Sequence, residues 1–358
     1  MSTSNSLSQL AFKKFKKNKT GFSSLLYVFF CGIIAVFCYV LAPDNSNSAN
    51  QMHLEIHSKK PGFSVEMLTI PSEKTQNQSW YTILLNGKKN TNTEVPIKSY
   101  TIKDDKLTFV QYSDGLTKEL NLSAIKNNPT KYIQKKTFYF GTDKYGRDLL
   151  SRLLIGTRIS FSIGFIAVLI SLLIGIPIGA IAGYFGGKLD AFIMWIINIT
   201  WSIPTLLLVI AITLALGKGF WQVFIAVGLT MWVEVARIVR GQVISTKQQQ
   251  YVEAAKALGF SDLRIIFKHI LPNIIAPIIV ISAANFAGAI LIESGLSFLG
   301  IGAQPPTPSW GSMIKNHYNY IILGKPFLAI IPGLAIMSLV MAFMLIGNAL
   351  RDALDVKS

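Results

Sequence analysis

The stretch Tyr251–Asn273, YVEAAKALGFSDLRIIFKHILPN, decides how the rest of the chain must be arranged. It is charged, it favours helix, and it lies between two long apolar runs. Charged residues are costly in the hydrocarbon of a bilayer. The segment therefore has to lie on one face of a membrane, with a span on either side.

The composition agrees with a membrane protein. The 358 residues are 51% hydrophobic and only 15% charged, which indicates several membrane spans and not a soluble domain. The formal net charge is +16. In such a chain an excess of Lys and Arg indicates cytoplasmic loops before it indicates nucleic acid. We expect no nucleic-acid partner.

The sequence shows no site for covalent chemistry. Cys31 and Cys38 are too far apart on one predicted helix to bridge, and we read them as small apolar residues of a span. It contains neither a metal-ligand cluster nor a phosphate-cradling G-x-x-x-x-G-K-[ST] loop. The chain is therefore not expected to bind a metal or to hydrolyse ATP itself.

Residues 1–21 form a basic arm with five lysines, which the positive-inside rule places in the cytoplasm. Phe12 and Phe15 could hold this arm on the anionic inner leaflet, or the arm could be a solvated tail. Residues 22–41 are apolar and long enough to cross a bilayer. We interpret them as a retained first transmembrane helix and not as a signal peptide, because no small-x-small cleavage site follows.

Residues 42–137 are polar and cannot span a membrane. Short alternating runs separated by turn residues predict a β-rich insert, which lies outside the cytoplasm if the arm lies inside. The runs are Trp80–Leu85, Ile97–Ile102 and Leu107–Tyr112.

Residues 138–348 form the predicted core, with five more transmembrane helices. They are expected at 161–184, 189–216, 220–239, 274–296 and 327–347. Asn198, Trp201, Ser202 and Pro204 interrupt the second of these, which fits either a cavity wall or a helix contact. Glycines spaced by four predict close helix packing, at Gly175, Gly179, Gly183 and Gly187.

The segment before residue 161 is amphipathic and begins with a charged motif. It either positions the following span at the interface or provides an external gate or docking surface. The residues of this outer motif are Asp143, Gly146, Arg147 and Asp148.

Charge also locates the loop at 240–272. Residues 237–269 carry six Lys and Arg against two acidic residues, which predicts a cytoplasmic loop. Four crossings from an inside amino terminus give the same answer. The tail 349–358 is then cytoplasmic as well. Glu234, near the inner end of its span, could pair with Arg237 or Arg240.

Within this loop we predict a helix–turn–helix. Gly259 is expected to end the first helix in a left-handed conformation, and Ser261 to begin the second. Ala254 and Ala255 would leave a low face that a partner can approach, and Glu253 would offer it a charge. A helix that merely caps the bundle is the alternative.

The spacing of Glu253-Ala254-Ala255, Gly259 and Leu271-Pro272 resembles the signature loop of permease subunits of bacterial ABC importers. Four further segments resemble the C-type subunit of dipeptide and oligopeptide permeases, at 140–160, 236–245, 293–311 and 350–355. The insert at 42–137 is longer than that family implies, and Asn348 and Val356 depart from its tail pattern.

The resemblance implies an all-α polytopic membrane protein of about six transmembrane helices, in the bacterial inner membrane, with both termini cytoplasmic. It implies a non-enzymatic subunit without a cofactor. ATP would bind to two partner ATPases, which grip the loop at Glu253, Ala254, Ala255, Gly259, Leu271 and Pro272. A homologous second permease, which could be a copy of this chain, and an extracytoplasmic substrate-binding protein complete the assembly.

The resemblance favours di- or oligopeptides as cargo, with nickel chelates or glutathione as alternatives. Asn198, Asn285 and Glu293 are the candidates for the substrate path, although Glu293 could instead make a structural hydrogen bond. A secondary transporter that works without ATP is the alternative from another class. It would need mid-membrane carboxylates and inverted repeats.

Overall fold

The computed structural model describes residues 7–71, 78–89, 92–103, 106–113, 115–121, 132–217 and 219–354. The chain divides into two compact units. The bundle unit comprises Met1–Gly32, Ser160–Gln304 and Leu334–Ser358, and the sheet unit comprises Ile33–Ile159 and Pro305–Gly333.

The fold is mostly helical. In the described part of the chain, five helices are long and apolar enough to cross a membrane, and a bent pair would provide a sixth. The five are α2 (Lys19–Leu41), α4 (Leu149–Phe185), α7 (Phe220–Lys247), α10 (Ile275–Leu299, with the helical turns from Asp262 that precede it) and α12 (Phe327–Leu354). The bent pair is α5 (Gly187–Ser202) and α6 (Thr205–Leu216).

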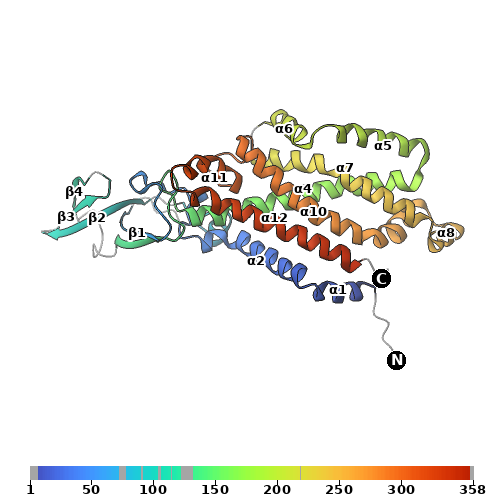
Figure 1. Ribbon diagram of the computed structural model, residues 1–358, viewed down its shortest axis with the longest axis horizontal. Coiled ribbons are helices and arrows are strands. Elements are labelled where there is room, and N and C mark those ends of the chain that lie inside the picture. The colour runs from blue at the N-terminus through green and yellow to red at the C-terminus, as the bar shows by residue number, and fades with distance from the viewer. Residues whose placement is uncertain are drawn as a thin grey trace, which may run out of the picture. The chain divides into compact units, whose positions relative to one another are not determined.

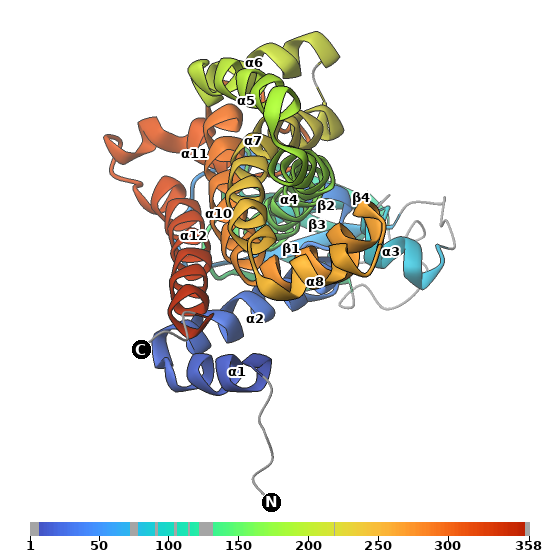
Figure 2. The ribbon, with the colours of Figure 1, turned by 90° about the vertical axis from the view of Figure 1, so that its right-hand side faces the viewer.

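Helices α5 and α6 meet at an angle of 92°. The predicted interruption is confirmed, and Pro204 explains it, because proline disfavours helix in the residue before it. Ile203 accordingly has an extended backbone, with φ −88° and ψ 127°. Both helices pack beside α7 (Figure 2).

The predicted glycine packing joins α4 to α7. A Cβ atom on Gly179 would lie 2.3 Å from the carbonyl oxygen of Ala236, and one on Gly183 would lie 2.7 Å from that of Arg240. A Cβ on Gly175 would lie 2.6 Å from the side-chain Cβ of Val235. Gly187 does not share this role, because it begins α5 and no atom would crowd its Cβ within 4 Å.

The insert contains one antiparallel sheet in the order β4-β3-β2-β1-β5 (Figure 1). The predicted runs Ile97–Ile102 and Leu107–Tyr112 lie in or overlap β2 and β3, which pair with each other. The turn residues expected between these two runs, at 104–105, lie outside the described residues. The strands are β1 (Phe63–Ile70), β2 (Thr93–Lys103), β3 (Lys106–Gln111), β4 (Thr117–Asn121) and β5 (Ile133–Phe138).

The strand prediction for Trp80–Leu85 is wrong. These residues lie in helix α3 (Trp80–Asn86). The carbonyl groups of Leu84 and Leu85, at the end of α3, accept hydrogen bonds from Arg158. A local reading of the sequence cannot anticipate a partner more than 70 residues away.

Within the basic arm, Leu7–Lys17 form helix α1. Phe15 is buried against Ala349 and Ala353 of α12, so this side chain contacts protein and not lipid. Phe12 stays exposed.

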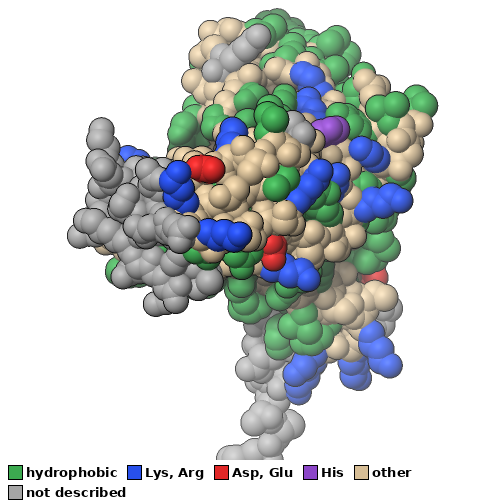
Figure 3. Space-filling view, turned by 90° about the vertical axis from the view of Figure 1, so that its left-hand side faces the viewer, with side chains coloured by type: hydrophobic (Ala, Val, Ile, Leu, Met, Phe, Trp, Pro, Cys, Tyr) green, Lys and Arg blue, Asp and Glu red, His purple; other side chains and the backbone are tan. Residues whose placement is uncertain are grey.

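On the face shown in Figure 3, the described Lys and Arg side chains are scattered among hydrophobic and polar groups and do not gather in one stripe.

Candidate functional site

The segment between α7 and α10 begins with α8 (Gln250–Ala257). Gly259 follows with φ 74°, so the predicted left-handed glycine is confirmed. A short helix α9 (Asp262–Ile265) comes next. We predicted a second loop helix separate from the next span, and that prediction is wrong. A π-helical turn (Ile266–Ile270) and a 3-10 turn (Leu271–Ile274) carry α9 directly into α10.

Helix α8 is anchored by two side chains. Val252 and Ala255, three residues apart on one helical face, are buried in a cluster with Val243 of α7 and Ile265 and Ile270 of the following turns. The prediction that both alanines face a partner is therefore wrong for Ala255. Ala254 is exposed, as is Glu253.

The outer face of the segment carries large apolar side chains whose exposure the sequence did not predict. Leu258 is 73% exposed, Leu263 is 66% exposed and Phe267 is 63% exposed. Helical spacing could have predicted this exposed face. Leu263 and Phe267 are four residues apart on one side of the helix, and the buried Ile266 and Ile270 lie on another side.

Polar contacts fasten the segment to the end of α4. The Tyr184 hydroxyl donates to Asp262 Oδ1 at 2.6 Å, and Lys247 donates to the Tyr184 carbonyl. The ammonium of Lys256 lies 5.2 Å from the centre of the Tyr184 ring. These contacts connect the segment to both α4 and α7.

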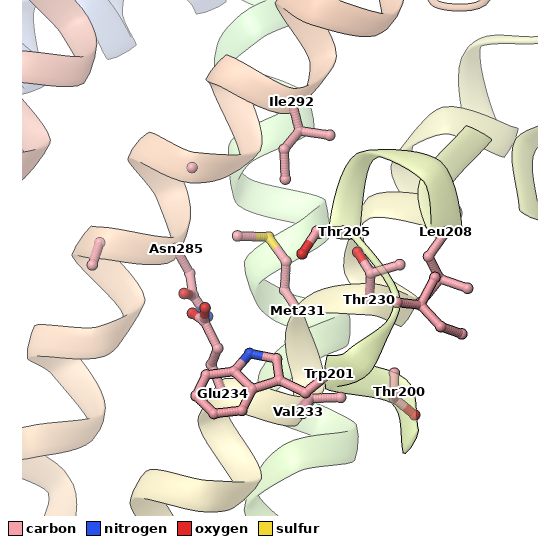
Figure 4. Close-up of a pocket in the computed structure, with 13 residues that line it drawn as sticks. Thr200, Trp201, Thr205, Leu208, Thr230, Met231, Val233, Glu234, Asn285 and Ile292 are labelled. Atoms are coloured by element: carbon pink, nitrogen blue, oxygen red, sulfur yellow. The ribbon is translucent and has the colours of Figure 1, made fainter. Parts of the chain in front are cut away.

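A cavity of about 280 Å³ lies among α5, α6, α7 and α10. Figure 4 shows the side chains of Glu234 and Asn285 directed toward each other at this cavity, with Trp201 and Met231 beside them. Asn285 is only 2% exposed, and its Nδ2 atom has no hydrogen-bond partner. An unpaired buried amide is unfavourable, so this donor is available to a bound molecule.

Of the predicted substrate-path residues, only Asn285 lines the cavity. Asn198 accepts a hydrogen bond from Arg237, whose guanidinium stacks 3.6 Å from the centre of the Trp201 ring. Glu293 is fully buried and accepts a hydrogen bond from Ser297 at 2.6 Å, which matches its structural alternative.

Glu234, which the sequence predicts only as a candidate ion-pair partner, is the carboxylate that lines the cavity. That prediction is wrong for Arg240, which pairs with Asp190 at 2.5 Å. Arg237 stacks on Trp201 instead. The sequence shows a carboxylate and two arginines at helical spacing. It does not show that side chains of α5 contact both arginines in the folded protein.

The outer motif at 143–148 is buried. Asp143 Oδ1 accepts the backbone N–H groups of Tyr145 and Arg147, and its Oδ2 pairs with the Arg147 side chain at 2.7 Å. A Cβ on Gly146 would lie 1.7 Å from the His53 carbonyl oxygen. Burial raises the pKa of the Asp148 carboxyl, and hydrogen bonds from Ser151 offset part of that rise. The reading of this motif as an exposed docking surface is wrong, because these side chains are not accessible; a gating role stays a prediction.

A bundle of membrane-length helices around an internal cavity fits a membrane transport component. Residues 175–357 match the family described as the binding-protein-dependent transport system inner membrane component. The chain belongs to this family, and it is a multi-pass inner-membrane protein and an ABC importer permease. The resemblance seen in the sequence is confirmed.

Three curated relatives illustrate the similarity. The dipeptide transport system permease protein DppC of Alkalihalophilus pseudofirmus is 42% identical over 66% of this chain and 78% of its own length. The glutathione transport system permease protein GsiD of Pectobacterium atrosepticum is 42% identical over 61% and 72%. The oligopeptide transport system permease protein OppC of Bacillus subtilis is 41% identical over 62% and 72%.

Proposed function

We propose that this chain lines the translocation path of an ATP-driven importer of short peptides, and that its 240–272 segment receives the movement of a partner ATPase. The names of the relatives support the cargo class. They specify dipeptides, oligopeptides and glutathione, and glutathione is itself a tripeptide. A short peptide is the cargo chemistry common to all three.

The observation that carries the coupling role is the exposed apolar face of this segment. We define the docking surface as Glu253, Ala254, Leu258, Leu263 and Phe267. Large apolar groups exposed together indicate an interaction site, and a helix that enters a groove is a common way to fill one. Gly259 shapes the turn of the segment, while Leu271 and Pro272 lie in the 3-10 turn at its junction with α10.

The proposed mechanism is a population shift. Two partner ATPases bind ATP, close on each other and displace the docking surfaces of this chain and of a homologous second permease. The 240–272 segment packs on α7, and α7 also carries Glu234 in the cavity wall. A conformation that the closed ATPases bind more tightly is therefore favoured, and the cavity changes its access from one side to the other.

The proposed arrangement in the membrane follows the charges. The basic arm, the 240–272 loop and the tail 349–358 lie in the cytoplasm, and the insert 42–137 lies outside, where a substrate-binding protein delivers the cargo. In the cavity, the Glu234 carboxylate attracts the ammonium group of a peptide, and Asn285 Nδ2 donates to a peptide carbonyl. Asn198 acts indirectly, by holding Arg237 against Trp201.

Co-purification of the ATPase with this chain tests the docking role. Glu253→Arg, Gly259→Asp and Leu263→Ala are each expected to reduce ATPase recovery and peptide uptake. Leu207→Ala is the matched control, because it removes the same atoms from a side chain of α6 that is 59% exposed. If all three variants retain the ATPase as Leu207→Ala does, the docking proposal is wrong.

Uptake of a labelled peptide tests the cavity separately. Glu234→Gln keeps the size of the side chain and removes its charge. We expect reduced peptide uptake with unchanged ATPase recovery. Unchanged uptake would show that this carboxylate does not contact the cargo.

A further inference from the structure

Helix α3 (Trp80–Asn86) exposes its apolar side chains. None of its seven residues is buried, and Trp80 is 75% exposed, Tyr81 57% and Leu85 62%. An isolated helix of this length is not stable in water. Because none of its side chains is buried in the described structure, side-chain packing does not stabilise α3. Another contact must stabilise this helix.

One arginine binds the backbone at the end of α3. Arg158 of α4 donates to the carbonyl oxygen of Leu85 at 2.7 Å and to that of Leu84 at 2.9 Å. The same guanidinium donates to the carbonyl oxygens of Ala35 and Val36 in α2, each at 2.7 Å. All of these residues belong to the sheet unit. Arg158 thus fixes the carboxyl end of α3 against α2.

The residue after α3 strengthens this attachment. A Cβ on Gly87 would lie 2.7 Å from the ring of Tyr39 in α2, and the φ angle of Gly87 is 77°. Both facts require glycine there. Lys88 then donates its backbone N–H to the Asn45 carbonyl, just after α2 ends.

This attachment places the end of α3 beside Val36 of α2, and we take the end of α2 at Leu41 as the membrane boundary. Val36 lies five residues before the end of α2 at Leu41, which is about 7.5 Å at a rise of ~1.5 Å per residue. Helices that lie in the headgroup region sit at about this depth, roughly 5–10 Å into the boundary. Val36, Val40 and Leu41 are 51%, 67% and 52% exposed, as expected for a lipid-facing surface of the first span.

The residues of α3 and its flank are those that membrane interfaces favour. Trp and Tyr gather where a bilayer meets water, and Lys side chains near them reach the headgroups. Trp80 and Tyr81 begin α3, and the exposed Lys88 and Lys89 follow it. We propose that α3 is an interfacial membrane anchor, which lies in the headgroup region beside the first span and has the lipid bilayer as its partner.

Nitroxide accessibility in the full chain tests this anchor. Cys31 and Cys38 are replaced by alanine, a spin label is attached through Tyr81→Cys, and the protein is reconstituted in vesicles of phosphatidylethanolamine and phosphatidylglycerol. Thr101→Cys on β2, also exposed and in the same unit, is the control. We expect oxygen to reach the label at 81 more readily than a water-soluble nickel chelate does, and the nickel chelate to reach the label at 101 freely.

Two results would overturn the proposal. Nickel access at 81 equal to that at 101 would place α3 in water. Shielding of 81 from both oxygen and nickel would mean that protein covers it. A second variant tests the attachment: Arg158→Lys keeps the charge but not the branched donors, and it should raise nickel access at 81 without changing it at 101.

Discussion

Helices α8 and α3 are both short and both expose large apolar groups on or beside them, yet they are held in different ways. Two buried side chains, Val252 and Ala255, hold α8 in the bundle unit. No side chain of α3 is buried, and a guanidinium holds its backbone carbonyls in the sheet unit. A helix anchored by one face leaves its other face exposed, which suits the protein partner that we propose for α8. A helix anchored by its backbone leaves its whole side-chain surface to be covered, which suits lipid.

The largest effect is expected where the anchor of α8 is broken. Ala255→Glu buries a charge without a partner, at a cost of about 3 to 5 kcal/mol, so α8 should detach. Ala254→Glu is the matched control, because Ala254 is exposed and should leave the helix intact. Hydrogen exchange of the α8 amides measures this. Equal protection in the two variants would contradict the anchoring role of Ala255.

The packing beneath α8 is the next to test. Gly179→Leu forces a side chain against the Ala236 carbonyl oxygen, and overpacking costs about 1 to 3 kcal/mol. Gly241→Leu on α7 places the same side chain where no atom lies within 4 Å of the new Cβ. Thermal unfolding in detergent should show a lower Tm for Gly179→Leu only. A comparable loss in both would mean that the α4–α7 contact is not what the glycine serves.

A smaller effect is expected at the attachment of α3. Arg158→Met removes hydrogen bonds from a charged donor, which we expect to cost about 2 kcal/mol in local stability. Exchange of the amides at 80–89 should accelerate, while exchange in α8 should not change. Faster exchange in both helices would show that Arg158 supports the whole protein and not α3 alone.

Acidification should weaken the sheet unit. His317 accepts the backbone N–H of Lys144 through Nε2, while its Nδ1 contacts the Met313 carbonyl, and burial lowers the pKa of His317. Burial lowers the pKa of His53 too. Below the ordinary histidine pKa of about 6.5, the unfolded chain binds protons that the folded chain does not, so stability falls as pH falls.

The Tm difference between about pH 7.5 and about pH 5.5 measures this effect. These values lie about one unit above and one unit below the ordinary histidine pKa. The drop should be smaller in His317→Gln than in the unmodified chain, with a residual part from His53. An unchanged drop would exclude His317 as a source of the pH dependence.

Hydropathy and turn chemistry were sufficient for much of this protein. The apolar runs predicted the long helices, Pro204 predicted the break between α5 and α6, and Gly259 predicted the end of α8. These features depend on residues close together in the chain. A charged segment between spans can only lie at a membrane face, whatever the bundle looks like.

The tertiary structure alone decided which side chains face which partner. It buried Ala255 and exposed Ala254, and it placed Glu234 at the cavity while Glu293 bonds to Ser297. It also showed Trp80–Asn86 as a helix, whose last carbonyl groups bind Arg158 more than 70 residues away in the chain. The free energy of these contacts depends on groups that folding brings together from distant positions, and no local pattern in the sequence records them.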